Sequence, residues 1–222
     1  MSGVFPISTA KFSTLGIKST QNTIISITDS GKKLSRQIDN QRFGFTAQII
    51  TAKRSDVYGE LMAFIMKQRS SKENFTIVSP EIKDARGSAN EVITVDGAIT
   101  AGATTFTLND ASVSAGATTC TVDNMTTSTN GILKAGDYFR FTGQSKVYMI
   151  VENVNTDGSG AVSTVTFEPP LISNVADNTV IIYDNVDFTV YLTNDIQEFG
   201  VVGADKDGNA LYQFEIDVEE AL

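Results

Sequence analysis

Apolar and polar residues alternate along the early part of the chain with the two-residue period of a β-strand. Residues 22–28 and 42–50 have the β-branched and aromatic composition that strands favour, and residues 42–50 also follow this period. The second segment carries apolar side chains on one side of the predicted strand: Phe43, Phe45, Ala47 and Ile49. Between the two strands, residues 29–41 form a long, basic, mobile-looking link, and links of this length are usually functional.

The period changes to that of a helix over about residues 55–69. Ser55 is a suitable N-cap, and Asp56 suits the positive end of the helix dipole. The apolar stripe predicts a face packed on a protein core: Val57, Tyr58, Leu61, Met62, Phe64 and Ile65. A further strand is expected over residues 73–82, where Pro80 ends it.

The composition changes near residue 87, from mixed and basic to acidic and rich in Thr, Ala and Gly. From there to about residue 185, short apolar runs alternate with turn signals, which is typical of a small β-barrel or sandwich. Segments 147–154 and 161–171 flank an Asp-Gly sequence and predict a hairpin. The last residues return to long amphipathic strands. We therefore expect a discontinuous domain, residues 1–86 with 186–222, that carries an inserted small β domain, residues 87–185.

A ten-residue phrase occurs twice at the start of this insert, as AGATTFTLND (101–110) and AGATTCTVDN (115–124). In the two copies Phe106 corresponds to Cys120, and Leu108 corresponds to Val122. The alternation predicts two similar strands that pack on one small core, with Cys120 as a buried apolar side chain. Two copies are too few for a solenoid.

Charge is distributed unevenly along a chain whose net charge is −9. Residues 1–86 contain 13 Lys and Arg against 7 Asp and Glu, whereas residues 87–222 contain 4 against 19. Solvated faces are one interpretation of this asymmetry. The other is that one half of a subunit meets the oppositely charged half of a neighbour. The acidic total argues against sequence-independent nucleic-acid binding.

The residue types exclude several kinds of chemistry. The chain has no histidine and a single cysteine, so catalytic triads, histidine metal sites and intrachain disulfides are impossible. Nucleotide-binding glycine loops are missing. Residues 205–209 match the start of a calcium loop, but Ala210 and Ile216 stand where that loop needs Gly and Glu, so we expect a plain hairpin turn. We predict no catalytic residue, cofactor or metal.

No membrane association is expected either. The first twenty residues lack the charged head and apolar stretch of a signal peptide. Nowhere does the chain approach 18 consecutive apolar residues. The sequence predicts a protein that is made and used in soluble form.

Three segments resemble a family of structural proteins from bacteriophage tails. They are KLSRQIDNQRFGFTAQI (33–49), SDVYGELMAFIMKQRSSKENFTIVSPEI (55–82) and LKAGDYFRFTGQSKVYMIVENVNTDGSGAVSTVTFEPPL (133–171). The resemblance implies a tail-tube-like β-sandwich with one flanking helix, which joins the sheets of neighbouring subunits into a ring. The basic link 29–41 would be an inter-subunit arm that uses four cations: Lys32, Lys33, Arg36 and Arg42.

The expected function is therefore that of a virion tail component, made in the host bacterial cytoplasm. Its partners would be copies of itself, in a closed ring of six, and other tail or baseplate proteins. DNA would only pass through an acidic lumen. The alternative is a β-rich module of a tail fibre or adhesin that binds a host glycan or surface protein. An enzyme is the third possibility, and 26 Asp and Glu without a distinctive motif do not favour it.

Overall fold

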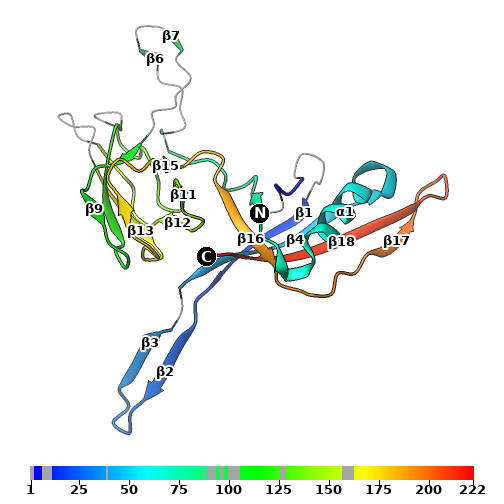
Figure 1. Ribbon diagram of the computed structural model, residues 1–222, viewed down its shortest axis with the longest axis horizontal. Helices are drawn as coiled ribbons and strands as arrows, with labels where there is room; N and C mark the ends of the chain where they lie inside the picture. The colour runs from blue at the N-terminus through cyan, green and yellow to red at the C-terminus, as the bar shows by residue number, and fades with distance from the viewer. Residues whose placement is uncertain are drawn as a thin grey trace. The chain divides into compact units, whose positions relative to one another are not determined.

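The computed structural model describes residues 3–6, 12–38, 40–87, 89, 94–95, 98–99, 106–125, 129–156 and 163–222. The chain divides into two compact units, drawn together in Figure 1. Unit 1 comprises Met1–Val78 and Phe188–Leu222, and unit 2 comprises Ser79–Asp187. The mainly β character predicted from the sequence is confirmed.

The chain enters unit 2 before residue 87, because the residues just ahead of it already contact the interior of that unit. Ala85 is buried in the core of unit 2, and its backbone N donates to the Tyr183 carbonyl at 3.1 Å. Arg86 Nε donates to Asp137 Oδ1 at 2.9 Å. The structural boundary, at Ser79, therefore comes earlier in the chain than the change in composition near residue 87.

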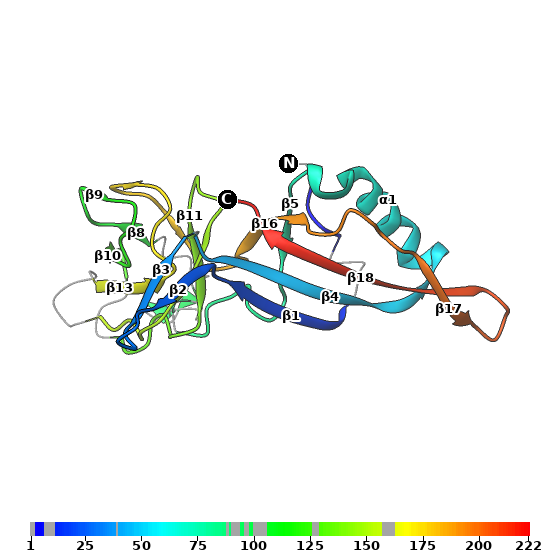
Figure 2. The same cartoon turned by 90° about the horizontal axis from the view of Figure 1, so that it is seen from below.

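Unit 1 contains a six-stranded sheet that is assembled from both ends of the chain. Five strands follow one another in the order β1 (Phe12–Thr20), β4 (Arg42–Lys53), β18 (Ala210–Glu220), β16 (Asp187–Leu192) and β5 (Phe75–Val78). The sixth, β17 (Gly200–Ala204), pairs with the first part of β18. Figure 2 shows β1, β4 and β18 running alongside one another. As the sequence predicts, the C-terminal strands complete the N-terminal sheet.

The predicted alternation of β4 is confirmed, since Phe43, Phe45, Ala47 and Ile49 are buried. Matching residues of β18 and β16 extend the same face: Phe214, Ile216, Val218, Phe188, Val190 and Leu192. Phe45 and Phe188 pack edge to face with their ring centroids 4.8 Å apart. Alternate residues of these strands point to the opposite face, which is polar.

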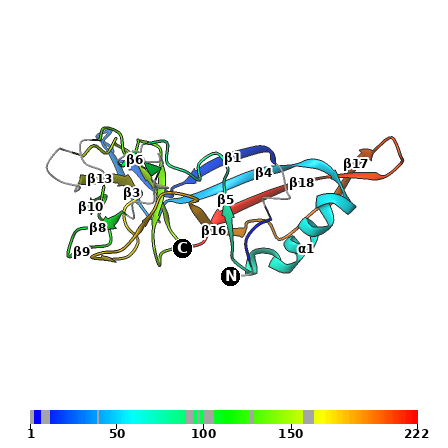
Figure 3. The ribbon, with the colours of Figure 1, turned by 90° about the horizontal axis from the view of Figure 1, so that it is seen from above.

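The helical segment packs on the apolar side of this sheet (Figure 3). It consists of a π-helical turn, Arg54–Tyr58, then α1, Gly59–Gln68, and a 3-10 turn, Ser70–Lys72. Tyr58, Leu61 and Ile65 are buried, as the apolar stripe predicts. Tyr58 stacks on Tyr212 of β18 at 4.8 Å between ring centroids.

The start of this helix differs from the prediction. Lys53, in extended conformation, precedes the first helical residue, and Ser55 does not cap the helix. Its Oγ donates instead to Asp56 Oδ1 at 3.1 Å. Gly59 accommodates the wide π-helical turn, because a Cβ at this residue would lie 2.8 Å from the Arg54 carbonyl oxygen.

Unit 2 is built around a nearly closed barrel of six strands. Their order is β15 (Ile181–Ile182), β11 (Tyr138–Phe141), β12 (Val147–Ile150), β13 (Ser163–Glu168), β10 (Thr119–Asp123) and β8 (Thr107–Leu108). The two ends of the sheet meet through backbone hydrogen bonds of 2.9 Å, from Leu108 N to Thr179 O and from Ile181 N to Phe106 O. Closure protects both edge strands from pairing with other chains.

Three short pairings complete the strands of the described residues. In unit 2, β9 (Ser112–Val113) pairs with β14 (Val175–Ala176), and β6 (Thr94–Val95) pairs with β7 (Ala98–Ile99). In unit 1, β2 (Thr23–Ile27) pairs with β3 (Lys33–Gln37). No helix among the described residues is long and apolar enough to span a bilayer.

The doubled phrase forms part of the barrel wall, although residues 101–105 lie outside the described part of the chain. Leu108 of β8 and Val122 of β10 are direct cross-strand partners. Both are buried in the core of unit 2, together with Phe106 and Cys120. The predicted packing of the two copies on one core is confirmed. The predicted hairpin of segments 147–154 and 161–171 is also confirmed, by the pairing of β12 with β13.

Candidate interaction surfaces

The predicted strand 22–28 is confirmed as β2, and part of the predicted basic link 29–41 forms β3, so that the two strands make a β-hairpin. Strands β2 and β3 pair from Thr23↔Gln37 to Ile27↔Lys33. A turn closes the hairpin, where Thr28 N donates to the Lys32 carbonyl at 3.0 Å and Gly31 has a φ of 78°. At its base, Ile38 N donates to the Asn22 carbonyl at 3.0 Å. We call residues 22–38 the hairpin arm.

Every residue of the two arm strands is exposed, and the arm nevertheless carries large aliphatic side chains on both faces. Their exposed fractions are 55% for Ile24, 55% for Ile25, 70% for Ile27, 49% for Leu34 and 59% for Ile38. Cross-strand pairing places Ile25 and Ile27 on one face and Ile24, Leu34 and Ile38 on the other. Such a surface is typical of an interaction site.

Cations accompany these aliphatic side chains on both faces. Lys33 lies directly opposite Ile27, and Arg36 lies opposite Ile24. Lys32 lies in the turn, and all three cations are exposed. The structure separates the fourth predicted arm residue, Arg42, from this group: it is the first residue of β4, in the main sheet of unit 1.

In the six-stranded sheet of unit 1, two strands leave an edge open among the described residues. Strand β1 pairs with β4 on one side only, and β17 pairs with β18 on one side only. All five residues of β17 are exposed, including Val201 and Val202 at 60% and 54%. Open edges of this kind are templates for pairing with another chain.

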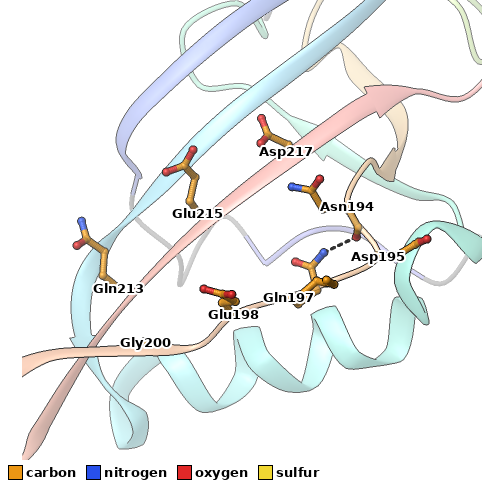
Figure 4. Close-up of a pocket in the computed structure, with 9 residues that line it drawn as sticks. Asn194, Asp195, Gln197, Glu198, Gly200, Gln213, Glu215 and Asp217 are labelled. Atoms are coloured by element: carbon orange, nitrogen blue, oxygen red, sulfur yellow. Dashed lines mark hydrogen bonds between the residues drawn. The ribbon is translucent and has the colours of Figure 1, made fainter.

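An acidic groove runs beside β18, where the chain leaves the sheet between β16 and β17 (Figure 4). It has a volume of about 680 Å³. Its lining residues come from the connection, the start of β17 and β18: Asn194, Asp195, Ile196, Gln197, Glu198, Gly200, Gln213, Glu215 and Asp217. We call this feature the β18 groove. Ile196, at 79% exposure, adds a large aliphatic side chain to its rim.

Hydrogen bonds keep two of the groove carboxylates ionised. Asp195 Oδ1 accepts from the hydroxyls of Ser71 at 2.9 Å and Ser70 at 3.0 Å, which lowers the pKa of this carboxyl. Asp217 Oδ1 lies 2.8 Å from Lys18 Nζ and 2.6 Å from Thr46 Oγ1, and these contacts lower the pKa of Asp217. Near neutral pH the groove is therefore negatively charged.

The Asp-Gly segment 205–209 forms the turn between β17 and β18, so the hairpin prediction is confirmed. Asp205 Oδ1 accepts from the backbone N of Asp207 at 2.8 Å and of Asn209 at 2.9 Å. The Asp205 carboxylate also pairs with Lys53, which together with Asn209 holds its pKa well below the usual range. In the described residues, no group of three or more Cys, Asp or Glu is arranged to hold a metal ion.

Cys120 lies inside the barrel, as the doubled phrase predicts. Burial, with a smaller contribution from the charge of Asp110, raises the pKa of its thiol to about 12. The thiolate is the nucleophilic form, so burial and the raised pKa disfavour reaction of this cysteine in the folded protein.

Sequence reasoning missed the β18 groove entirely. Its acidic residues come from two segments, 195–198 and 213–217, with a complete hairpin turn between them. The only local signal is the alternation of acidic and apolar residues near the C-terminus, which also fits an ordinary solvated strand face. Comparison of the chain with protein-family models and with curated proteins finds no match.

Proposed function

We propose that this protein is a structural subunit of a bacteriophage tail that assembles into a closed ring. The hairpin arm is the observation that carries this proposal. An isolated two-stranded hairpin with aliphatic side chains on both faces gains little from folding, so its exposed surface suits burial against another protein. The proposal that this assembly is a phage tail rests on the resemblance to tail structural proteins, which covers residues 33–49, 55–82 and 133–171.

The open edges of unit 1 support a ring of copies of this chain. Strands β1 and β17 each offer an unpaired side, and head-to-tail pairing of sheets generates a ring when the rotation closes. In this proposal unit 1 is tail-tube-like, the ring has six subunits as tail tubes generally do, and it lies in the tube, distal tail or baseplate. The acidic C-terminal half of the chain would suit a negatively charged lumen that lets DNA pass without sticking.

Assembly state is the direct test. Analytical ultracentrifugation and negative-stain microscopy of the purified protein, alone and with tail partner proteins, should show rings or tubes. A protein that stays monomeric with these partners and binds glycans on an array would overturn the proposal and favour the adhesin alternative. Hydrolysis of a polysaccharide above background would favour an enzyme.

Removing the arm provides a sharper test of the same proposal. Asn22 and Ile38 already meet at the base of the hairpin, so residues 23–37 can be excised and replaced with a two-residue Asn-Gly turn. The variant should keep the circular dichroism spectrum and cooperative unfolding of the parent and should fail to assemble. Assembly that survives this excision would exclude the arm as the contact.

A further inference from the structure

We infer that the hairpin arm of one subunit docks in the β18 groove of the next subunit. The inference deepens the proposed function and rests on it, because it names the surface that receives the arm. It requires two copies of the chain and assigns a role to a groove that the sequence did not reveal.

Charge complementarity is the first observation that pairs these surfaces. The arm presents Lys32, Lys33 and Arg36 in exposed positions. Four carboxylates line the β18 groove: Asp195, Glu198, Glu215 and Asp217. Asp217 already contacts Lys18 and Asp195 already accepts two hydroxyl groups, whereas Glu198 and Glu215 are exposed. Glu198 and Glu215 are therefore the carboxylates best placed to meet the cations of the arm.

Exposed aliphatic surface is the second observation. Large exposed apolar side chains of unit 1 include two groups that could meet across an interface. The first group lies on the arm and comprises Ile24, Ile25, Ile27, Leu34 and Ile38. The second comprises Ile196, which lines the groove, and Val201 and Val202, which follow the lining residue Gly200 in β17. Contact between the two groups would remove the aliphatic side chains of one arm face from water, which supplies affinity, while the charges set the orientation.

The position of the arm makes docking on its own groove unfavourable. The arm leaves the six-stranded sheet where Thr20 pairs with Arg42, at the start of β4, and Figure 2 shows it at the opposite end of the strands from β17. The groove lies near Glu215, which pairs with Gln48. From Arg42 to Gln48 the strand spans about 20 Å at about 3.4 Å per residue. The arm extends away from the groove, so a neighbour placed head to tail is its natural acceptor.

Engineered disulfides test the contact directly. Cys120 is buried and unreactive, so a new surface thiol is the reactive one in each single variant. An Ile25→Cys protein mixed with a Glu198→Cys protein should form a disulfide-linked dimer under mild oxidation, seen on a non-reducing gel and placed by mass spectrometry. Mixing Ile25→Cys with Val151→Cys, an exposed residue of unit 2, is the matched control and should give background cross-linking.

Charge reversal provides an independent test. Lys33→Glu with Arg36→Glu should raise the dissociation constant for assembly by about tenfold or more, and so should Glu198→Lys with Glu215→Lys. Combining all four changes in one chain should restore assembly. Lys67→Glu, an exposed charge on α1, is the control and should leave assembly unchanged.

The outcomes separate this inference from the proposed function. If the wild type never assembles, alone or with tail partners, both are overturned. If it assembles and arm excision abolishes assembly, but neither the cross-link nor the charge rescue appears, the groove is not the acceptor and the ring proposal stands. Cross-linking together with rescue would establish the arm-to-groove contact.

Discussion

Single residues in this protein are constrained most where two backbones approach closely. Gly44 lies in β4 opposite Glu219 of β18, and a Cβ at Gly44 would lie 2.9 Å from the Val218 carbonyl oxygen. The strand ladder holds that oxygen in place, so an added methyl group cannot be accommodated by a side-chain movement. The glycine thus allows the two longest strands of the sheet to pair.

We expect Gly44→Ala to lower the free energy of unfolding by about 1–3 kcal/mol, the usual cost of overpacking. Gly200→Ala is the control, because a Cβ at this residue of β17 would meet no atom within 4 Å. That variant should be neutral or slightly stabilising. Urea denaturation followed by circular dichroism measures both, and equal effects would contradict the close-approach explanation.

The buried thiol of Cys120 predicts a pH dependence of stability. Its folded pKa of about 12 exceeds the unfolded value, so the unfolded state releases a proton that the folded state keeps as the pH rises. The contribution of the buried thiol to the free energy of unfolding is therefore fully present below the unfolded pKa of about 8.5. Above that pH the free energy of unfolding falls, by about 2 kcal/mol at about pH 10. Urea denaturation at about pH 7.5 and about pH 10 should show the loss.

In Cys120→Ala, the free energy of unfolding should fall less between the two pH values, by the amount that Cys120 contributes. Tyrosines and lysines titrate equally in both proteins, so they do not affect this difference. A native protein that reacts rapidly with a thiol reagent at about pH 8 would show that Cys120 is not protected.

At the scale of elements, the hairpin arm differs from the strands that build the core of unit 1. Strands β4, β16 and β18 bury alternate side chains in a core, and the fold depends on them. The arm strands bury none of theirs. Residues of the arm should therefore affect association without affecting the stability of the subunit.

We expect Ile25→Thr with Ile27→Thr to change the free energy of unfolding by less than about 0.5 kcal/mol, as exposed substitutions do. The same variant should assemble more weakly, because the hydroxyl and the smaller side chain reduce the apolar area buried on association. Ile49→Ala, in the core face of β4, is the contrasting control and should cost about 2–5 kcal/mol. A large loss of stability from the arm variant would place the arm in the fold itself.

For the whole molecule, the two units have separate cores, and this predicts separate folding. The core of unit 2 is a single cluster drawn from residues between Ala85 and Tyr183. Its strands form a nearly closed barrel without a strand from unit 1. In unit 1, β5 and β16 flank the insertion and are neighbours in the sheet.

Residues 79–187 expressed alone should therefore fold cooperatively, with a β-rich circular dichroism spectrum and a thermal transition matching one in the intact protein. Calorimetry of the full chain should show two transitions rather than one. An isolated unit 2 that is unfolded, or a single transition that fits a two-state model, would mean that the units depend on each other.

Much of the fold follows from local patterns in the sequence. The alternation of Phe43, Phe45, Ala47 and Ile49, the helical stripe around Leu61, and the Asp-Gly turn at Asp205 each need only neighbouring residues, and each is confirmed. The prediction that Ser55 caps the helix is wrong, because capping depends on the residue at which the helix begins. Here the preceding strand continues to Lys53, and the helix opens with a π-helical turn at Arg54.

Long-range pairing decided the rest. Residues 33–37 have no apolar alternation of their own, and they become a strand because β2 pairs with them. Arg42 belongs to the main sheet because β4 begins there. The β18 groove exists only once the connection between β16 and β17 is folded beside β18. The sequence by itself determined strand composition, the helix and the turns, since these depend on propensity and period. Only the tertiary structure decided which strands pair and which charges share a surface, because register joins residues far apart in the chain.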